Sequence, residues 1–184
     1  MARALVILAD GCEEIEAVTV LDVLRRGGVD VVGAALAGKW VHGNHGIGIE
    51  ADVVLDEALD QSFDMLILPG GQPGATHLAA DARVRRLLKE FEGKGRYIAA
   101  ICAAPGVLAE AGLLRGRKAT SFPDAIKDLS GISYMESAVV RDGKIITSRG
   151  PGTALDFALS LLELLQGAEV RIKVEARLQR PRQP

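Results

Sequence analysis

Short apolar runs rich in Val, Ile and Leu alternate along the chain with longer segments of helical periodicity. The runs predict buried strands; they are ALVILA (4–9), VDVVGAAL (29–36), FDMLILPGG (63–71) and RYIAAI (96–101). The longer segments predict helices; they are EEIEAVTVLDVLRRGG (13–28), ARVRRLLKEFEGKG (82–95), APGVLAEAGLL (104–114) and TALDFALSLLELLQG (153–167). The first helix carries apolar residues at three-residue steps, at Ile15, Val18, Leu21 and Leu24.

Strands that are apolar on both faces and are separated by helices predict a mostly parallel sheet covered on both sides. The expected fold is therefore α/β, a flavodoxin-like doubly wound sheet with helices on both faces. The run AVVRDGKIITS (138–148) carries Asp-Gly-Lys between two apolar stretches, which predicts a hairpin. The glycine-rich segment 37–59 predicts a small hairpin or excursion beside the sheet. No linker or internal repeat divides the chain, so we expect one domain over residues 1–170.

Four segments leave the predicted sheet at the edge where its strands end. They are DGCEEIE (10–16), PGGQPGATH (69–77), CAAPG (102–106) and TSFPD (120–124). Active sites of open α/β sheets lie beyond the carboxyl ends of the strands. We therefore expect these four segments to be neighbours in space and to carry the chemistry.

Cys102 lies where a buried strand changes into a helix, which we expect to begin at about Ala103. The positive end of a helix favours thiolate over thiol, so we expect a lowered cysteine pKa. Small neighbours permit the sharp turn of a nucleophile elbow, and Pro105 suits the first turn of a helix. A buried, inert cysteine is the alternative interpretation.

Glycines and acidic residues of the other segments complete the candidate site. Gly70 and Gly71 directly follow a strand, so their backbone N–H groups, with that of Ala103, are candidates for an oxyanion hole. A simple glycine turn is the alternative. Three acidic residues, Glu13, Glu14 and Glu16, open the first helix, and a carboxyl held near a thiol in an apolar cleft has a raised pKa. Such a group acts as a proton donor or a general base. Periodicity alone does not decide which of the three points inward.

The remaining cysteine and the histidines carry weaker signals. Cys12 is a second thiol, and we expect a small buried residue there. His42, His45 and His77 lie in glycine-rich loops, without an acidic or cysteine ligand at suitable spacing, so we expect no metal and no other cofactor.

Composition and charge limit the function classes. With 184 residues, 48% of them hydrophobic and 25% charged, the chain has the composition of one ordinary globular domain. The net charge of −2 gives no reason to expect specific nucleic-acid binding. Residues 171–184 are expected to form a basic C-terminal tail, whose last ten residues, EARLQRPRQP, are frayed and solvated. No apolar run spans a bilayer or matches a signal peptide, and two cysteines make no disulfide framework, so we expect a cytoplasmic protein without membrane contact.

Five segments together resemble the ThiJ/PfpI superfamily. They are RALVILADGCEEIEAV, DVLRRGGVDV, LPGGQPGA, AAICAAPGVLAEAGLL and ITSRGPGTALDFAL, and they occur in the family's order from about residue 3 to residue 169. The chain is most similar to the parkinsonism-associated protein deglycase branch and its bacterial stress-protein relatives. The resemblance implies a flavodoxin-like fold and a homodimer.

The resemblance also implies a site and an activity. Cys102 would be the oxidation-sensitive nucleophile, Glu16 the protonated carboxyl bonded to it, and Gly71 and Ala103 the backbone oxyanion donors. The implied substrates are reactive dicarbonyls, with conversion of methylglyoxal to lactate and removal of early glycation adducts from proteins or nucleotides. Redox-dependent chaperone and stress-response roles belong to the same branch.

Two positions depart from the family pattern. Many relatives carry a histidine near the cysteine in the segment matching TSFPD, where this chain has Phe122. The peptidase-like relatives have a histidine directly after the cysteine, where this chain has Ala103. A Cys-His pair for peptide hydrolysis is therefore missing from the pattern, and we do not expect a peptidase.

The leading hypothesis is a glutathione-independent glyoxalase or protein deglycase that uses Cys102 and Glu16. The rival hypothesis is a redox-sensing stress-response chaperone in which Cys102 is oxidised to sulfinic acid. Both use the same residues, so the sequence does not separate them. A plain structural domain is the third interpretation.

Overall fold

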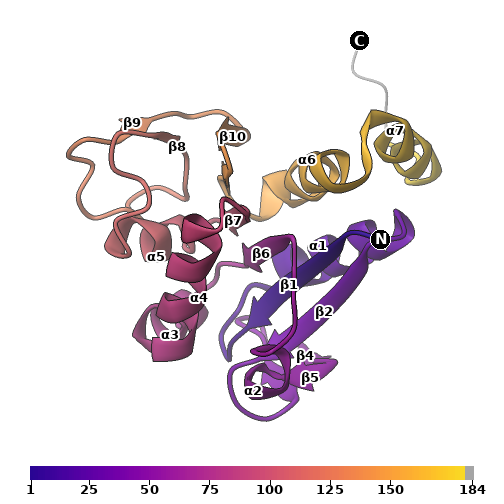
Figure 1. Ribbon diagram of the computed structural model, residues 1–184, viewed down its shortest axis with the longest axis horizontal. Helices are drawn as coiled ribbons and strands as arrows, with labels where there is room; N and C mark the ends of the chain where they lie inside the picture. The colour runs from indigo at the N-terminus through magenta and orange to yellow at the C-terminus, as the bar shows by residue number, and fades with distance from the viewer. Residues whose placement is uncertain (181–184) are drawn as a thin grey trace.

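Seven strands form one sheet in the order β10-β11-β7-β6-β1-β2-β5 (Figure 1). The computed structural model describes residues 1–180. Neighbouring strands run parallel except for the β10–β11 hairpin, which is antiparallel as expected. The strand bounds are β1 Arg3–Leu8, β2 Asp30–Ala35, β5 Val53–Val54, β6 Met65–Leu68, β7 Tyr97–Ile101, β10 Val139–Asp142 and β11 Ile145–Ser148. The flavodoxin-like doubly wound prediction is confirmed.

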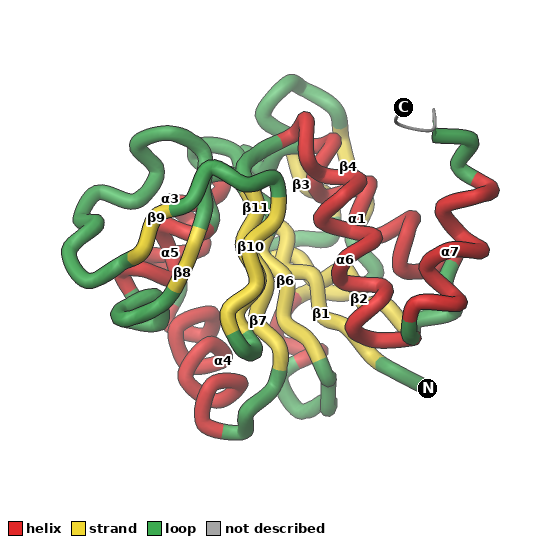
Figure 2. The backbone as a smooth tube through the Cα atoms, turned by 90° about the horizontal axis from the view of Figure 1, so that it is seen from above, coloured by secondary structure: helices red, strands yellow, loops and turns green. Residues whose placement is uncertain are grey.

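Helices cover both faces of this sheet (Figure 2). One face packs against α1 (Glu14–Arg26), α6 (Ala154–Gln166) and α7 (Ala168–Arg177). The other packs against α2 (Leu55–Ala58), α3 (Gly74–Ala80), α4 (Ala82–Gly93) and α5 (Pro105–Glu110). Successive strand residues point to opposite faces, so Val6 joins the first core while Leu5 and Ile7 join the second. The continuous apolar runs of the sequence follow from this double burial.

Helix α1 forms where the three-residue spacing predicted a helix, but it buries only some of the apolar residues at those steps. Ala17, Val20 and Leu24 are buried against the sheet, whereas Ile15 and Val18 are 56% and 48% exposed. The helix period of 3.6 residues brings positions three and four apart onto one face, so a strict three-residue step drifts around the helix. Ile15 and Val18 therefore leave an apolar strip on the surface.

Small elements complete the fold outside the main sheet. The segment 37–59 forms the expected excursion, an antiparallel pair of β3 (Trp40–His42) with β4 (Gly48–Glu50), and then returns to the sheet as β5. A second pair, β8 (Lys118–Ala119) with β9 (Ser133–Tyr134), is parallel, and the 3-10 helix Pro151–Thr153 precedes α6.

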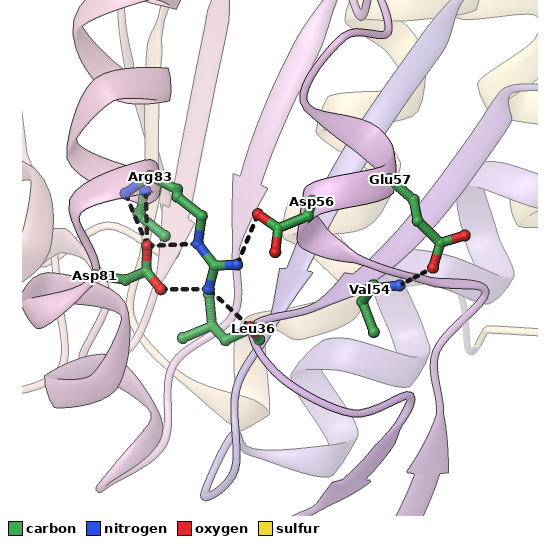
Figure 3. A network of polar contacts seen from close by, with 7 residues as sticks. Leu36, Val54, Asp56, Glu57, Asp81 and Arg83 are labelled. Atoms are coloured by element: carbon green, nitrogen blue, oxygen red, sulfur yellow. Dashed lines mark hydrogen bonds and ion pairs between the residues drawn. The ribbon is translucent and has the colours of Figure 1, made fainter.

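Arg83 at the start of α4 joins three segments that are distant in the sequence (Figure 3). Its guanidinium donates to the carbonyl of Leu36 after β2, at 2.7 Å, and pairs with Asp56 of α2 at 3.0 Å. It also contacts Asp81, the N-cap of α4, at 2.6 Å, and this hydrogen-bonded pair holds the pKa of Asp81 below its usual range. The network ties the sheet edge around β2 and β5 to the helices on that face.

The chain end is more ordered than the sequence suggested. Helix α7 covers residues 168–177; Val174 is buried, and Arg171 pairs with Glu163 of α6 at 3.0 Å. Arg180 pairs with Asp156, also of α6, at 2.7 Å. Helix α7 therefore extends into the segment expected to be a basic tail, and basic side chains there pair with acidic residues of α6 and of α7 itself. Residues 181–184 of that tail lie outside the described residues.

Candidate active site

Four segments meet at the carboxyl edge of the sheet, as their order in the sequence predicted. The N–H of Glu13 in the β1–α1 turn donates to the carbonyl of Gly70 in the β6–α3 turn at 2.9 Å. In the β7–α5 turn, the carbonyl of Cys102 accepts the N–H of Phe122 at 2.9 Å. The N–H of Cys102 donates to the carbonyl of Ser148 at 3.0 Å. The site is thus held by backbone hydrogen bonds between turns.

Cys102 occupies a strained backbone position directly after β7. Its φ of 63° lies in the left-handed region, which a residue with a side chain adopts at a cost of about 1–3 kcal/mol. The side chain is mostly buried, with the residue 8% exposed. Helix α5 begins at Pro105 rather than at Ala103, so residues 102–104 form the turn itself. This is the sharp strand-to-helix elbow that the sequence suggested.

Two glycines let the neighbouring turn approach the elbow. A Cβ at Gly70 would lie 2.7 Å from the Cβ of Cys102 and 2.8 Å from the nitrogen of Ala103, which is too close for any side chain. Gly71 has φ +88°, and a Cβ there would meet the backbone of the β1–α1 turn. The backbone N–H groups of Gly71 and Ala103 lie near enough to the Cys102 thiol to lower its pKa. The N–H of Gly70 has another partner, so of the two glycines only Gly71 offers its amide to the thiol.

That partner is Glu16, whose side chain is completely buried. Its Oε2 accepts the N–H of Gly70 at 2.8 Å, while its Oε1 makes no hydrogen bond of ordinary geometry within the described residues. Burial raises the pKa of Glu16 to about 7, and the negative charge of Glu13 adds to the rise. The Gly70 N–H and the nearby Cys102 thiol act in the opposite direction. At neutral pH this carboxyl therefore exists in both protonation states.

The pKa of Cys102 is raised, not lowered as the helix position suggested. Burial and then the negative charge of Glu16 raise it to about 12, against the lowering by the N–H groups of Gly71 and Ala103. Helix α5 has only six residues and begins beyond the elbow, so its dipole is weak at the sulfur. Burial is the largest cause of the raised pKa, the negative charge of Glu16 adds to it, and the two neighbouring acids titrate as a coupled pair.

The two other acidic residues of α1 are also buried, but only one of them joins the thiol region. Glu13 is the N-cap of α1, and its Oε2 accepts the N–H of Glu16 at 2.8 Å. Glu14 instead accepts the N–H of His45 at 2.6 Å and lies 3.0 Å from its ring Nδ1. These bonds hold the β3–β4 hairpin and lower the pKa of Glu14, against the effect of burial.

The hairpin also brings together a group that sequence spacing did not find. Glu13, Glu14 and His45 each offer one atom of a type that binds metal ions, and these three atoms lie within 4.8 Å of one another. The sequence offered no acidic partner near His42 and His45, because both acids belong to a helix thirty residues away. Glu13 and Glu14 are already engaged by backbone N–H groups, which explains their burial without an ion.

Cys12 and Phe122 border the site in different ways. Cys12 is 1% exposed, and burial raises its pKa to about 11, in agreement with a small core residue. Phe122 is 51% exposed, and its ring lies close to Gly150 in the loop after β11. The backbone N–H of Phe122 bonds to Cys102. A half-exposed apolar ring thus occupies the position where relatives were expected to carry histidine.

Comparison with known proteins identifies the family. The model of the DJ-1/PfpI family matches residues 2–164. The chain belongs to the DJ-1/PfpI family. Among its relatives, the Parkinson disease protein 7 homolog of Danio rerio is 45% identical over 181 residues, covering 96% of this chain and 96% of the relative. The glutathione-independent glyoxalase DJR-1.2 of Caenorhabditis elegans is 39% identical over 170 residues, covering 90% of each.

Two further comparisons place this DJ-1/PfpI chain. It is 44% identical over 169 residues to Protein DJ-1 homolog B of Arabidopsis thaliana; the match covers 91% of this chain but only 39% of that relative. The crystal structure of Drosophila melanogaster DJ-1beta superimposes with a TM-score of 0.94 at 41% identity, covering 98% of this chain and 99% of that one. The resemblance drawn from the sequence segments is confirmed at the level of the family and the fold.

Proposed function

We propose that this protein converts small 2-oxoaldehydes, methylglyoxal in the first place, to 2-hydroxy acids without glutathione or another cofactor. The observation that carries the proposal is the fully buried Glu16 carboxyl, which is bonded to Gly70 in the turn packed against Cys102, with the N–H groups of Gly71 and Ala103 near the thiol. The family includes a relative named as a glutathione-independent glyoxalase, which supports the reaction class.

The first step joins the thiol to the aldehyde carbon. Because the pKa of Cys102 is raised to about 12, the resting thiol keeps its proton, and ionised Glu16 removes it as sulfur attacks. The new S–C bond leaves an alkoxide, which the N–H groups of Gly71 and Ala103 stabilise. Protonated Glu16 then gives the proton to this oxygen, completing a hemithioacetal and returning the carboxyl to its ionised form.

The second step moves hydrogen between the two carbons. Glu16 takes the proton from the carbon bonded to sulfur and delivers it to the neighbouring carbonyl carbon through an enediol, while the hydroxyl proton passes from the first oxygen to the second. This leaves a lactoyl thioester on Cys102. Water cleaves that thioester to lactate and restores the thiol, so the overall reaction consumes one water and no redox partner. A pKa of about 7 suits Glu16 to both removing and returning a proton near neutral pH.

The test is lactate formation from methylglyoxal in the absence of glutathione. Cys102→Ser and Glu16→Gln are each expected to reduce kcat/KM by about 100-fold or more. Cys12→Ser is the matched control, because it removes the other buried thiol and is expected to keep activity near the wild-type level. Equal rates for wild type and Cys102→Ser would show that this mechanism is wrong.

A finer part of the proposal concerns glycated macromolecules as substrates. Early adducts of methylglyoxal with thiols and amines release the free aldehyde reversibly, so an enzyme that removes free methylglyoxal also lowers the adducts. Direct deglycase action requires that adduct loss exceeds the spontaneous release rate when free methylglyoxal is trapped chemically. Loss at the spontaneous rate would restrict the substrate to the free dicarbonyl.

Redox sensing is the second candidate function, and the free oxygen of Glu16 favours it. A sulfinate on Cys102 would meet the N–H groups of Gly71 and Ala103 and a carboxyl that is half protonated near neutral pH. Mass spectrometry after mild peroxide should then show a selective gain of two oxygens at Cys102. The raised thiol pKa predicts slow oxidation, and absence of that selective gain would remove this candidate.

A further inference from the structure

Three hydrogen bonds close a ring between the two turns that carry the candidate site. The N–H of Glu13 donates to the carbonyl of Gly70 at 2.9 Å, and the N–H of Gly70 donates to Oε2 of Glu16 at 2.8 Å. The N–H of Glu16 then donates to Oε2 of Glu13 at 2.8 Å. We refer to this closed set as the Glu13–Gly70–Glu16 ring. It links the β1–α1 and β6–α3 turns beneath the Cys102 elbow.

Glu13 enters this ring both through its backbone and through its side chain. It is only 5% exposed, and its carboxylate caps α1 by accepting the N–H of Glu16, the residue whose side chain faces the thiol. An N-cap on a surface helix needs only a short polar side chain, and Asp or Ser serves as well as any residue. A buried carboxylate placed beside a second buried carboxyl is electrostatically unfavourable, so helix capping alone does not account for this choice.

The charged surroundings of Glu16 within the described residues are few. Glu13 faces it from the same helix start, and Cys102 faces it from the β7–α5 turn. His45 of the β3–β4 hairpin lies 3.9 Å from Oε1 of Glu13, with its ring mostly exposed. Glu14 is bonded to that hairpin.

We propose that Glu13 is a positioning residue, which orients the Glu16 carboxyl toward Cys102 through the ring and places a second negative charge beside that carboxyl. Two functions of one side chain can then be separated by substitution. Glutamine keeps an oxygen that accepts the N–H of Glu16 but removes the charge. Alanine removes both the charge and the cap, and leaves only the backbone bond to Gly70.

The first experiment follows the protonation of Glu16 itself. The carboxyl ¹³C resonance of Glu16, assigned by its loss in Glu16→Gln, is titrated in wild type, Glu13→Gln and Glu14→Gln. Removing the negative charge of Glu13 favours ionised Glu16, so the midpoint is expected to fall by roughly half a pH unit in Glu13→Gln. Glu14→Gln is the matched control, because it makes the same change one residue away on a carboxylate that bonds to the hairpin. Its midpoint is expected to stay at the wild-type value.

The second experiment measures orientation, and this part rests on the proposed function. The acidic limb of the pH profile for lactate formation should move to lower pH in Glu13→Gln, with kcat within a few-fold of wild type. Glu13→Ala should lose about tenfold or more in kcat, because a carboxyl displaced by an ångström no longer meets the reacting atoms. Recovery of kcat in the glutamine variant separates positioning from a general loss of folding, which thermal unfolding of each variant checks.

Each outcome decides one claim. An unchanged Glu16 midpoint in Glu13→Gln, or an equal change in Glu14→Gln, would overturn the electrostatic role of Glu13. Full kcat in a folded Glu13→Ala variant would overturn the positioning role. If wild type forms no lactate but the Glu16 midpoint still falls in Glu13→Gln, the electrostatic role of Glu13 stands and the proposed glyoxalase function fails.

Discussion

A single buried carboxyl determines much of the chemistry at the residue scale. Glu16 is fully buried, and one of its oxygens makes no ordinary hydrogen bond with residues 1–180, which is an unfavourable placement for an ionised group. The protein tolerates it because the protonated form removes the penalty below neutral pH. Stability and function are thereby coupled at one side chain, since the ionised form that accepts a proton from Cys102 is also the form that destabilises the fold.

This coupling predicts how stability depends on pH. Because the pKa of Glu16 is raised from 4.5 to about 7, its contribution is fully present below pH 4.5 and is lost as pH rises through about 7. At about 1.4 kcal/mol per unit, the wild-type free energy of unfolding should fall by about 3 kcal/mol between pH 4.5 and about pH 8, relative to Glu16→Gln. Urea unfolding at several pH values measures this. Parallel curves for the two proteins would contradict it.

Phe122 supports a second prediction at this scale. Its backbone N–H bonds to the carbonyl of Cys102, and its half-exposed ring offers no group that transfers protons. Phe122→His introduces an imidazole that titrates near neutral pH, and we expect kcat for methylglyoxal to rise by about tenfold. Phe122→Leu is the control that alters the ring without adding a proton carrier. An equal rise in both variants would show that ring size, not proton transfer, limits the rate.

At the scale of elements, turns rather than helices build the site. The elbow, the glycine turn and the start of α1 are joined by backbone hydrogen bonds, and helix α5 begins only after the elbow. The close approach depends on residues without a Cβ, since Gly70 would otherwise collide with Cys102 and Ala103. The geometry at the sulfur therefore depends on turn conformation more than on a helix dipole.

Gly71→Ala tests that dependence. The substitution places a Cβ at φ +88° against the backbone of the β1–α1 turn, so we expect a loss of about 1–3 kcal/mol in stability. The displaced amide should also lower kcat, because one of the two oxyanion donors moves away. Gly93→Ala is a suitable control, since nothing lies within 4 Å of the added methyl there. Wild-type stability and kcat in Gly71→Ala would refute the close-approach argument.

The sequence predicted the longer strands of the sheet, the helices α1, α4, α5 and α6, and the four segments that meet at the site, because apolar periodicity is a local signal and parallel strands end at one edge. It did not predict α3 or α7. It left open which acid of α1 faces the thiol, since Glu13, Glu14 and Glu16 are all buried and only tertiary contacts distinguish them. It predicted the wrong direction for the pKa of Cys102, because burial and the Glu16 charge are properties of the fold. The sequence also did not show that Glu14 is the partner of His45, because the two residues are distant along the chain.

At the scale of the whole molecule, an apolar strip remains uncovered. Ile15 and Val18 of α1 are 56% and 48% exposed, and Ile47 of the hairpin held by Glu14 is 59% exposed. We propose that a second copy of the chain covers this strip, which is the homodimer expected from the family resemblance. No helix in residues 1–180 is long and apolar enough to cross a membrane.

A charge in the strip tests this assembly. Val18→Asp places a carboxylate at the centre of the proposed interface, where its burial without a partner is unfavourable. Sedimentation equilibrium should show a dimer for wild type and a dissociation constant raised by about 100-fold or more for the variant. Ile172→Asp, on exposed α7, is the control and should not change the association state. A monomeric wild type would rule out the dimer.

The strand order has one more consequence, for how the thiol meets its surroundings. The three turns that carry the site follow β1, β6 and β7, each of which is hydrogen-bonded to a strand on both sides. Such interior strands open only with global unfolding, so their amides should be among the slowest in hydrogen exchange. Cys102, which is only 8% exposed, is then reached through the turns around it, and the shape of those turns selects which reagents fit.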